Sequence, residues 1–150
     1  MNQHEIEALV VVRVIPAPPQ SVYKAWTEPE LMRQWLAPEP NVVISVDNQL
    51  KAGGKLHIIM QSPDGDQHII RGEYQALIPH RYIAKTWCYS GPVAIIRDIE
   101  TLLEVTLTAV DDVKTELTLT QRRLKTKSAC DAYQADWPSC LDKLQNIFLH

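Results

Sequence analysis

The chain has 150 residues, a length that suits one domain, so we expect residues 1–150 to form a single soluble domain with its own hydrophobic core. Hydrophobic residues make up 45% of the chain, and the formal net charge is −3. A protein that follows nucleic-acid phosphates normally carries an excess of basic residues, so this charge argues against a nucleic-acid partner. No apolar run approaches the ~20 residues that a membrane-spanning helix needs.

Cysteine use and the N-terminal residues indicate a reducing compartment. The three cysteines, Cys88, Cys130 and Cys140, are odd in number and include no Cys-x-x-Cys pair, so we expect no disulfide framework. Residues 1–12 lack the basic start, the apolar stretch and the small-residue cleavage site of a signal peptide. We therefore expect a cytoplasmic protein, and either a monomer or a homodimer is consistent with the sequence.

The first part of the chain predicts a strand followed by two short helices. Residues 6–15 are rich in β-branched side chains and end at a proline, which is typical of a strand. A helix over residues 18–26 follows, because proline is tolerated in a first helical turn. A second helix over residues 27–36 starts at once, with capping-box spacing between Thr27 and Glu30, and further prolines stop it.

The middle of the chain predicts short strands separated by tight turns. Apolar and polar side chains alternate most clearly in residues 56–61, 70–76 and 103–108. The Gly53-Gly54 pair marks a turn or a close approach of two backbones, and Pro63–Asp66 is a strong hairpin turn. Strands so close together imply an antiparallel meander of about six strands.

Two segments of this region have more than one interpretation. In residues 81–89 the alternation is irregular, because Lys85 shares a parity with the apolar Ile83 and Trp87. A β-bulge or a strand covered on both faces would account for this pattern. Residues 93–96 (VAII) form either an apolar loop over the mouth of a pocket or an extension of the next strand.

The last segment predicts one long amphipathic helix. Its apolar residues recur at helical steps of three or four: Ala129, Tyr133, Trp137, Leu141, Leu144 and Phe148. Ser128 and Asp131 predict a capped start. Pro138 lies inside, and an internal proline removes a hydrogen bond at a cost of ~3 kcal/mol or more, so we expect a kink or a break near residues 134–138. An antiparallel sheet must cover one face, and this helix alone is long enough, so the predicted class is α+β.

Four segments carry a resemblance to a known family: residues 25–38 (AWTEPELMRQWLAP), Gly53-Gly54, residues 72–87 (GEYQALIPHRYIAKTW) and residues 136–144 (DWPSCLDKL). Together they resemble the activator of heat-shock protein 90 ATPase homologue family of the START-like (SRPBCC, birch-pollen-allergen-like) superfamily. The resemblance implies the helix-grip fold, in which a curved sheet of about six or seven antiparallel strands grips a C-terminal helix around a cavity. The chain departs from the family in having Asp136 where glycine is usual and in having Pro138.

The predicted ligand-binding residues are side chains expected to face this cavity: Met60, Tyr74, Trp87, Tyr133, Trp137 and Leu141. Aromatic and aliphatic walls of this kind suit a small apolar ligand. Tryptophans also pack in ordinary cores, which is the favoured interpretation of Trp26 and Trp35. For Trp137 and Tyr74 the two interpretations are equally open.

Patterns for catalysis or metal binding are missing from the sequence. His57 stands alone on a predicted strand, and the five histidines have no metal-ligand spacing. Asp64 and Asp66 fall in a turn, where Asp commonly bonds to the local backbone. The sequence contains no Gly-x-Ser-x-Gly elbow and no phosphate-binding loop. We therefore predict no catalytic residue, no metal ligand and no cofactor.

Three functions stay open. The first is a non-enzymatic binder of a small hydrophobic or amphipathic molecule, such as a lipid. The second is a chaperone-associated or stress-related interaction protein, using the outer face of the sheet or the basic run QRRLKTK (121–127), which is otherwise a solvated turn. The third is a cyclase- or hydrolase-type enzyme, which would need a polar group with a perturbed pKa in the pocket, with His57 and Tyr74 inspected first.

Overall fold

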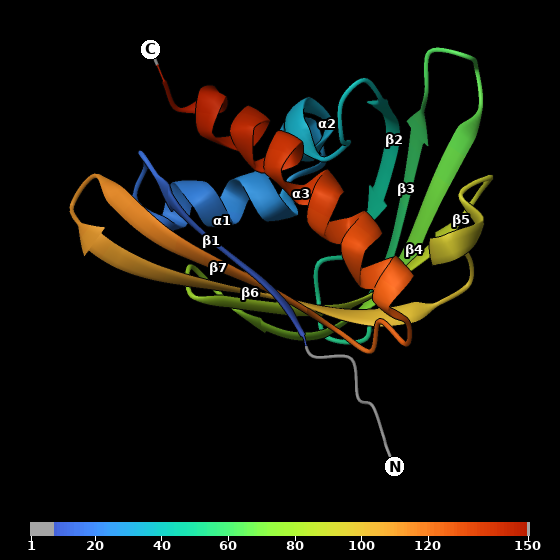
Figure 1. The fold of residues 1–150 in the computed structure, drawn as a ribbon. Helices are drawn as coiled ribbons and strands as arrows, with labels where there is room; N and C mark the ends of the chain where they lie inside the picture. The colour runs from blue at the N-terminus through green and yellow to red at the C-terminus, as the bar shows by residue number, and fades with distance from the viewer. Residues whose placement is uncertain (1–7, 150) are drawn as a thin grey trace.

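Residues 8–149 are described by the structure, a computed structural model, and they form one antiparallel sheet covered on one face by helices (Figure 1). The elements in chain order are β1 (Leu9–Ile15), α1 (Pro19–Thr27), α2 (Pro29–Trp35), β2 (Val42–Asn48), β3 (Lys55–Gln61), β4 (Gln67–Ile78), β5 (Tyr82–Ser90), the 3-10 helix η1 (Ala94–Ile96), β6 (Glu100–Asp111), β7 (Lys114–Arg122) and α3 (Lys127–Ile147). The predicted α+β class and the helix-grip arrangement are confirmed.

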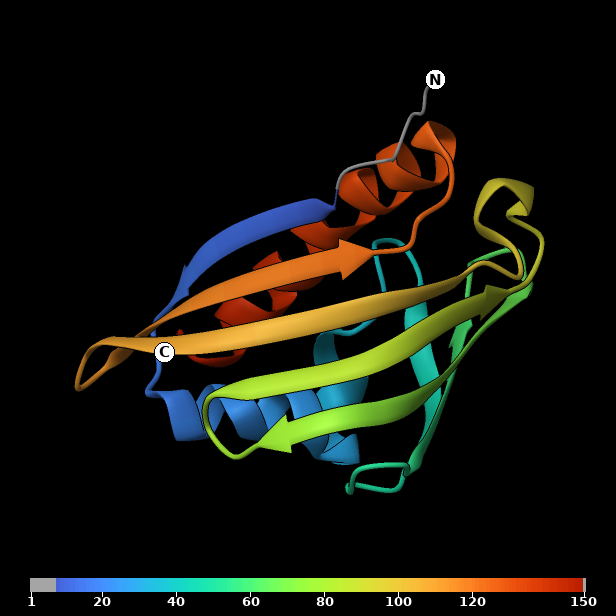
Figure 2. The ribbon, with the colours of Figure 1, turned by 90° about the horizontal axis from the view of Figure 1, so that it is seen from below.

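The sheet has seven strands in the order β1-β7-β6-β5-β4-β3-β2, and all neighbours are antiparallel. It is strongly curved, and α3 crosses its concave side together with α1 and α2 (Figure 1). The opposite, convex side carries no helix among the described residues (Figure 2). Within residues 8–149 no helix is long and apolar enough to cross a membrane.

The side chain of Lys85 points into the covered side of the sheet. β5 pairs with β6 without a register shift, and Ile83, Lys85 and Trp87 are all buried. The irregularity lies instead in the neighbouring β4, where the register shifts between Tyr74 and Ala76. The position of Lys85 in the alternating pattern therefore indicates correctly that its side chain points inward. The β-bulge lies in the partner strand β4.

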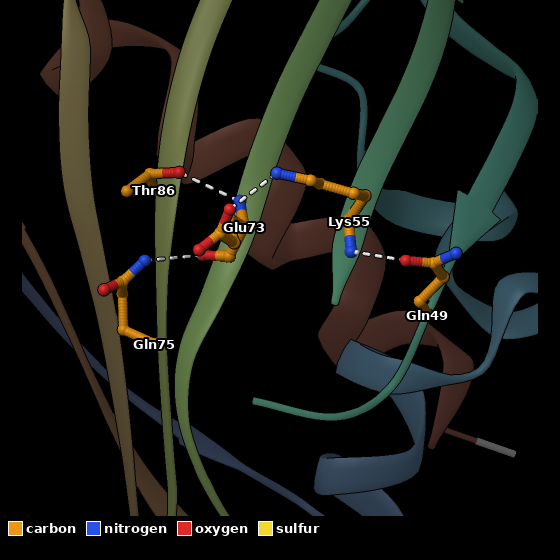
Figure 3. Close-up of polar contacts among 5 residues, drawn as sticks. All are labelled: Gln49, Lys55, Glu73, Gln75 and Thr86. Atoms are coloured by element: carbon orange, nitrogen blue, oxygen red, sulfur yellow. Dashed lines mark hydrogen bonds and ion pairs between the residues drawn. The ribbon is translucent and has the colours of Figure 1, made fainter. Parts of the chain in front are cut away.

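Polar contacts on the other face of β3, β4 and β5 lie next to this bulge (Figure 3). The Glu73 carboxylate is 2.6 Å from Lys55 Nζ, and the Glu73 backbone N–H donates to Thr86 Oγ1 at 2.9 Å. The amide oxygen of Gln49 accepts from the Lys55 backbone N–H at 3.0 Å. An exposed ion pair of this kind contributes only ~0–1 kcal/mol, so the pair between Lys55 and Glu73 adds little to stability.

The Gly53-Gly54 pair holds the turn before β3 against β4. Gly53 has a φ of +82°, and its N–H donates to the Tyr74 carbonyl at 2.8 Å. A Cβ atom on Gly54 would lie 1.9 Å from the Gln49 carbonyl oxygen. The predicted close approach of two backbones is therefore confirmed, and only glycine fits at this second position.

The long helix α3 is continuous through Pro138, so of the predicted kink or break the break is wrong, while the kink stays a prediction. Proline at this position cannot donate to the carbonyl of Gln134, one turn earlier. Both Gln134 and Pro138 lie on the exposed side of the helix, where water can hydrate the freed carbonyl. The cost of the missing bond is thereby reduced without interrupting the buried face.

Two predicted helix caps are wrong. The N-cap of α3 is Thr126, whose Oγ1 accepts from the Ala129 N–H at 3.0 Å, instead of Ser128. Thr27 ends α1, and its hydroxyl donates to the Tyr23 carbonyl at 2.8 Å instead of capping α2. Several hydroxyl side chains close to a helix start give the same sequence signal, and the exact dihedral angles decide which one caps.

Candidate functional site

A cavity of about 330 Å³ lies between the sheet and residues 132–140 of α3. Its wall is formed by the segment between α2 and β2, by β3, β4 and β5, by η1 and by α3. The lining residues Glu39, Pro40 and Val93 are exposed, so the cavity reaches the surface between the α2–β2 segment and η1. Cavities of roughly 300–1,000 Å³ are typical of small-molecule sites.

Residues 93–96 form the apolar loop that was one of two interpretations of the sequence. η1 occupies residues 94–96, and Val93 and Ile96 both line the cavity. The backbone N–H of Val93 donates to the Tyr89 hydroxyl at 3.2 Å. One side of the cavity mouth is therefore tied to β5.

Four of the six predicted ligand-binding residues line the cavity: Met60, Trp87, Tyr133 and Trp137. The ring centroids of Trp87 and Trp137 are 5.6 Å apart, so β5 and α3 contribute one continuous aromatic wall. Leu141 lies outside the lining and is fully buried in the core. That any of these residues binds a ligand stays a prediction.

Tyr74, the remaining predicted residue, also lies outside the cavity lining. Its hydroxyl donates to Asn48 Oδ1 at 2.5 Å, and Asn48 Nδ2 donates to the Thr27 carbonyl at 2.6 Å. Burial raises the pKa of the Tyr74 hydroxyl above its ordinary value. In the structure Tyr74 therefore joins β4 to β2 and to the end of α1.

Trp137 is held in one orientation by a buried chain of hydrogen bonds. Its Nε1–H donates to Gln121 Oε1 at 3.0 Å, Gln121 Nε2 donates to Thr101 Oγ1 at 3.0 Å, and Thr101 donates to the Trp87 carbonyl at 2.7 Å. Each such bond contributes about 1 kcal/mol, and leaving a partner unpaired costs more. The sequence did not single out Gln121, although Gln121 lies two residues after Leu119 on β7 and therefore on the same buried face of the strand.

His68 and Tyr89 form a polar pair in the cavity wall that the sequence analysis also missed. His68 Nδ1 lies 2.6 Å from the Tyr89 hydroxyl, and Nε2 lies 3.1 Å from Ser62 Oγ. The Ser62 hydroxyl donates to Asp64 at 2.6 Å, so it accepts from His68 Nε2–H. Nδ1, on the other edge of the ring, pairs with the Tyr89 hydroxyl. The pairing crosses from β4 to β5, so linear spacing did not reveal it.

Asp136 is a half-buried carboxyl group of the lining that has no cationic partner among residues 8–149. Burial raises the pKa of Asp136 above its ordinary value, because its charged form loses water, and nearby His68 opposes part of this rise. Glu39, another acid of the lining, differs because Lys143 Nζ lies 3.1 Å from its carboxylate. Asp136 is therefore an acid of the wall that forms no ion pair within residues 8–149.

The hydroxyl of Tyr133 is a second unsatisfied polar group of the same wall. Tyr133 is 5% exposed, and within the described part of the chain its hydroxyl has no hydrogen-bond partner. Tyr133 and Asp136 lie three residues apart on α3, a spacing that places them on one helix face. Both residues line the cavity, and the hydroxyl oxygen of Tyr133 is itself fully buried.

Two other groups that could react are a cysteine of the lining and a histidine that lies outside it. Cys140 lines the cavity, but burial raises the pKa of its thiol to about 12, so it does not form a thiolate at neutral pH. His57, the histidine considered first, lies on β3 outside the lining, opposite Asp47 and Arg71.

A buried amine lies next to the cavity but outside its lining. Lys85 is 0% exposed, and among the residues described its Nζ atom has no hydrogen-bond partner. This atom lies 5.4, 5.5 and 5.7 Å from the ring centroids of Trp26, Trp87 and Tyr74. Burial lowers the pKa of Lys85 to about 7, while the three rings favour its charged form.

The curved sheet, the gripping helix and the cavity between them define a START-like helix-grip protein. Residues 16–148 match the family described as Activator of Hsp90 ATPase homolog 1-like protein, and the chain belongs to this family. The resemblance found in the sequence is therefore confirmed. No curated protein sequence matches the chain at a significant level.

Solved bacterial structures share the fold over nearly the whole chain. A Silicibacter pomeroyi protein named AHSA1 is 19% identical with a TM-score of 0.81, covering 94% of this chain and 96% of its own. A Chromobacterium violaceum protein is 23% identical with a TM-score of 0.79, covering 95% and 97%. A Nitrosomonas europaea protein is 19% identical with a TM-score of 0.79, covering 93% and 92%. At these identities the likeness establishes the fold alone.

Proposed function

We propose that this chain is a non-enzymatic binder of a small hydrophobic or amphipathic molecule, held in the cavity between the sheet and α3. The observation that carries this proposal is the cavity of about 330 Å³ with its aromatic and aliphatic wall. A ligand that buries apolar surface there gains about 25 cal/mol per Å². The few polar groups of the wall would fix the orientation of the ligand.

The fixed orientation of Trp137 supports this proposal. A side chain held by the hydrogen bond to Gln121 does not have to be ordered when a ligand arrives. Immobilising a free side chain on binding costs about 0.5–1.5 kcal/mol, so a wall that is already ordered favours affinity.

The cavity favours binding over turnover. Both ring nitrogens of His68 are engaged, so a substrate would have to displace Ser62 or Tyr89 before His68 could exchange a proton with it. The cyclase- or hydrolase-type alternative would therefore require a rearrangement of this pair. The chaperone-associated alternative rests on the family description, and Arg122 of its basic run already pairs with Glu104 at 2.6 Å.

Filling the cavity tests the proposal. We expect Ala132→Phe, which adds a ring to the lining, to abolish the blue shift that the neutral dye prodan shows on binding. Gln134→Phe adds the same ring to the exposed side of the same helix and serves as the matched control. Native mass spectrometry of protein purified from its own host would identify a bound molecule. A protein that is always empty, and that binds the dye equally well after Ala132→Phe, would contradict the proposal.

A further inference from the structure

We propose that β1 is a dimerisation strand: two copies of this chain pair through their β1 edges, antiparallel and about a two-fold axis at Val12, so that the two sheets become continuous. Such an interface is isologous, because the same strand serves both copies. It lies on the rim of the sheet and goes beyond the function proposed for the cavity.

β1 is an edge strand whose outer side is open in the described part of the chain. It pairs with β7 alone and lies at one margin of the sheet (dark blue in Figure 2). Among residues 8–149, no backbone hydrogen bond joins residues 9–15 to a strand other than β7. Every second residue of an edge strand directs its backbone N–H and C=O groups to the open side, so β1 can pair with one more strand.

The solvent-facing side of β1 is apolar. Val10, Val12 and Val14 are 53%, 55% and 47% exposed, whereas Leu9 and Ile15 on the other face are buried. Successive residues of a strand alternate between faces, so the three valines form one stripe on the convex side of the sheet. Soluble proteins usually protect an edge strand with a charge, a proline or a bulge. The valine stripe contains no charged residue, β1 contains no proline, and its register with β7 shows no shift.

The opposite edge of the sheet is protected in the ways that β1 is not. The register of β2 shifts between Val43 and Ser45, and its Asp47 is exposed. Helix α2 also packs against β2. The contrast between the two edges singles out β1 as the edge suited to receive another strand.

The sequence of β1 is complementary to itself. Opposed residues of an antiparallel pair face the same side, so two copies with Val12 opposite Val12 also place Val10 opposite Val14. Each valine of the stripe then meets a valine of the other copy, and β-branched cross-strand pairs stabilise a sheet. An axis at Arg13 would set two guanidinium groups opposite each other, and an axis at Val11 would leave Val14 without a valine. The side chains therefore favour the register centred on Val12.

The charged groups beside this axis are complementary as well. Arg13 Nη1 lies 2.6 Å from Asp142 Oδ1, and the side chain of Asp142 is 67% exposed. With the axis at Val12, Arg13 of one copy lies diagonal to Arg13 of the other, within reach of a long side chain. Each Asp142 is then open to a second guanidinium group, so two positive and two negative groups balance at the axis. The valine stripe and these paired charges together select a second copy of this chain as the occupant of the edge.

Sedimentation velocity of the full chain over a range of concentrations tests the interface. We expect the wild type to show a concentration-dependent equilibrium between monomer and dimer. Val12→Lys sets two ammonium groups opposite each other, so the dissociation constant of the dimer should rise at least about tenfold. Val42→Lys replaces a valine that is 57% exposed on the other edge strand, β2, and is the matched control that should leave this constant unchanged.

A second measurement uses the wild type alone and reports the register. In a mixture of isotope-labelled and unlabelled chains, filtered NOE spectra should show contacts between the Val10 methyl groups of one copy and the Val14 methyl groups of the other. Within one copy these residues lie about 13 Å apart along the strand, so such a contact reports the antiparallel pairing. Exchange of the outward-directed amide hydrogens of β1 should also slow as the protein concentration rises.

Three results would overturn the inference: a wild type that stays monomeric at millimolar concentration, a Val12→Lys variant that dimerises as tightly as the wild type, or a dimer without contacts between Val10 and Val14. Slow exchange of the outward-directed β1 amides at concentrations where the chain is monomeric would overturn it too. In that case residues 1–7 of the same chain, and not a second copy, cover the edge.

Discussion

Two aromatic regions of this molecule each hold one ionisable group that forms no ion pair within residues 8–149, and one group is an amine while the other is a carboxyl. In the filled region, which we define as Trp26, Trp35, Tyr74 and Lys85, all four side chains are buried and lie outside the cavity lining. In the cavity region, the rings of Trp87, Tyr133 and Trp137 surround open space beside Asp136. The two regions contact each other, since the ring centroids of Trp26 and Trp137 are 6.3 Å apart.

The difference lies in what can compensate each group. A charge in the filled region can be neutralised only by releasing its proton, so Lys85 acts on the stability of the fold. A charge beside a cavity can gain a partner from solution, and Asp136 lines such a cavity. Whether an ionisable group lies in a filled region or beside open space therefore decides which kind of compensation is available to it.

Replacing Lys85 is the largest expected effect. The unfolded chain has the ordinary lysine pKa of 10.5, and burial lowers the folded value to about 7. Between pH 7 and pH 10.5 the unfolded state binds more protons than the folded state, so the stability of the wild type rises with pH over this range. Below pH 7 lysine is protonated in both states, and the wild type has its lowest stability, which no longer changes with pH through this group. We expect Lys85→Met to be more stable than wild type by about 5 kcal/mol near pH 6, and this advantage to vanish near pH 10.5. Urea unfolding of both proteins at several pH values measures this difference in unfolding free energy.

The exposed Lys55 is the matched control for this change. Lys55→Met removes an ion pair on the solvent face and should shift stability by less than about 1 kcal/mol at every pH. If the stability difference between Lys85→Met and wild type does not depend on pH, the amine is charged throughout and the two regions do not differ as described.

Two methionines sharpen the contrast in packing. Met32 of α2 is 0% exposed and away from the cavity, while Met60 of β3 is 5% exposed and lines it. Met32→Ala should cost about 2–5 kcal/mol of unfolding free energy, because it opens a void in a packed core. Met60→Ala should cost less, since part of that side chain already faces empty space and has fewer contacts to lose. Denaturant unfolding compares them, and equal losses would show that the cavity region is packed as tightly as the core.

Two tyrosines give the smallest expected effect. Tyr74→Phe leaves Asn48 Oδ1 without its donor and should cost about 1–2 kcal/mol. Tyr133→Phe removes a buried hydroxyl that has no partner within residues 8–149, so stability should stay the same or rise by less than about 1 kcal/mol. Thermal unfolding of the two variants without added ligand tests this. A loss in Tyr133→Phe equal to that in Tyr74→Phe would mean that the Tyr133 hydroxyl is already satisfied.

The cavity wall was predictable only in part. The helical stripe placed Tyr133 and Trp137 on the inner face of α3, and strand alternation placed Met60 on the inner face of β3, whereas Trp87 lies in a strand whose alternation is irregular. The same patterns also selected Tyr74 and Leu141, which face inward but lie in packed regions. Periodicity reports which face of an element is covered, but it does not report where along that face the helix leaves a gap.

The sequence by itself determined the fold class, because a period of two in the strands and of about 3.6 in the last helix are local properties of the chain. The tertiary structure decided which side chains meet: His68 with Tyr89 across two strands, and Trp137 with Gln121 between α3 and β7. It also decided that Lys85 is enclosed by aromatic rings while Asp136 borders open space. Burial and charge compensation depend on neighbours distant in sequence, so only the folded chain assigns them.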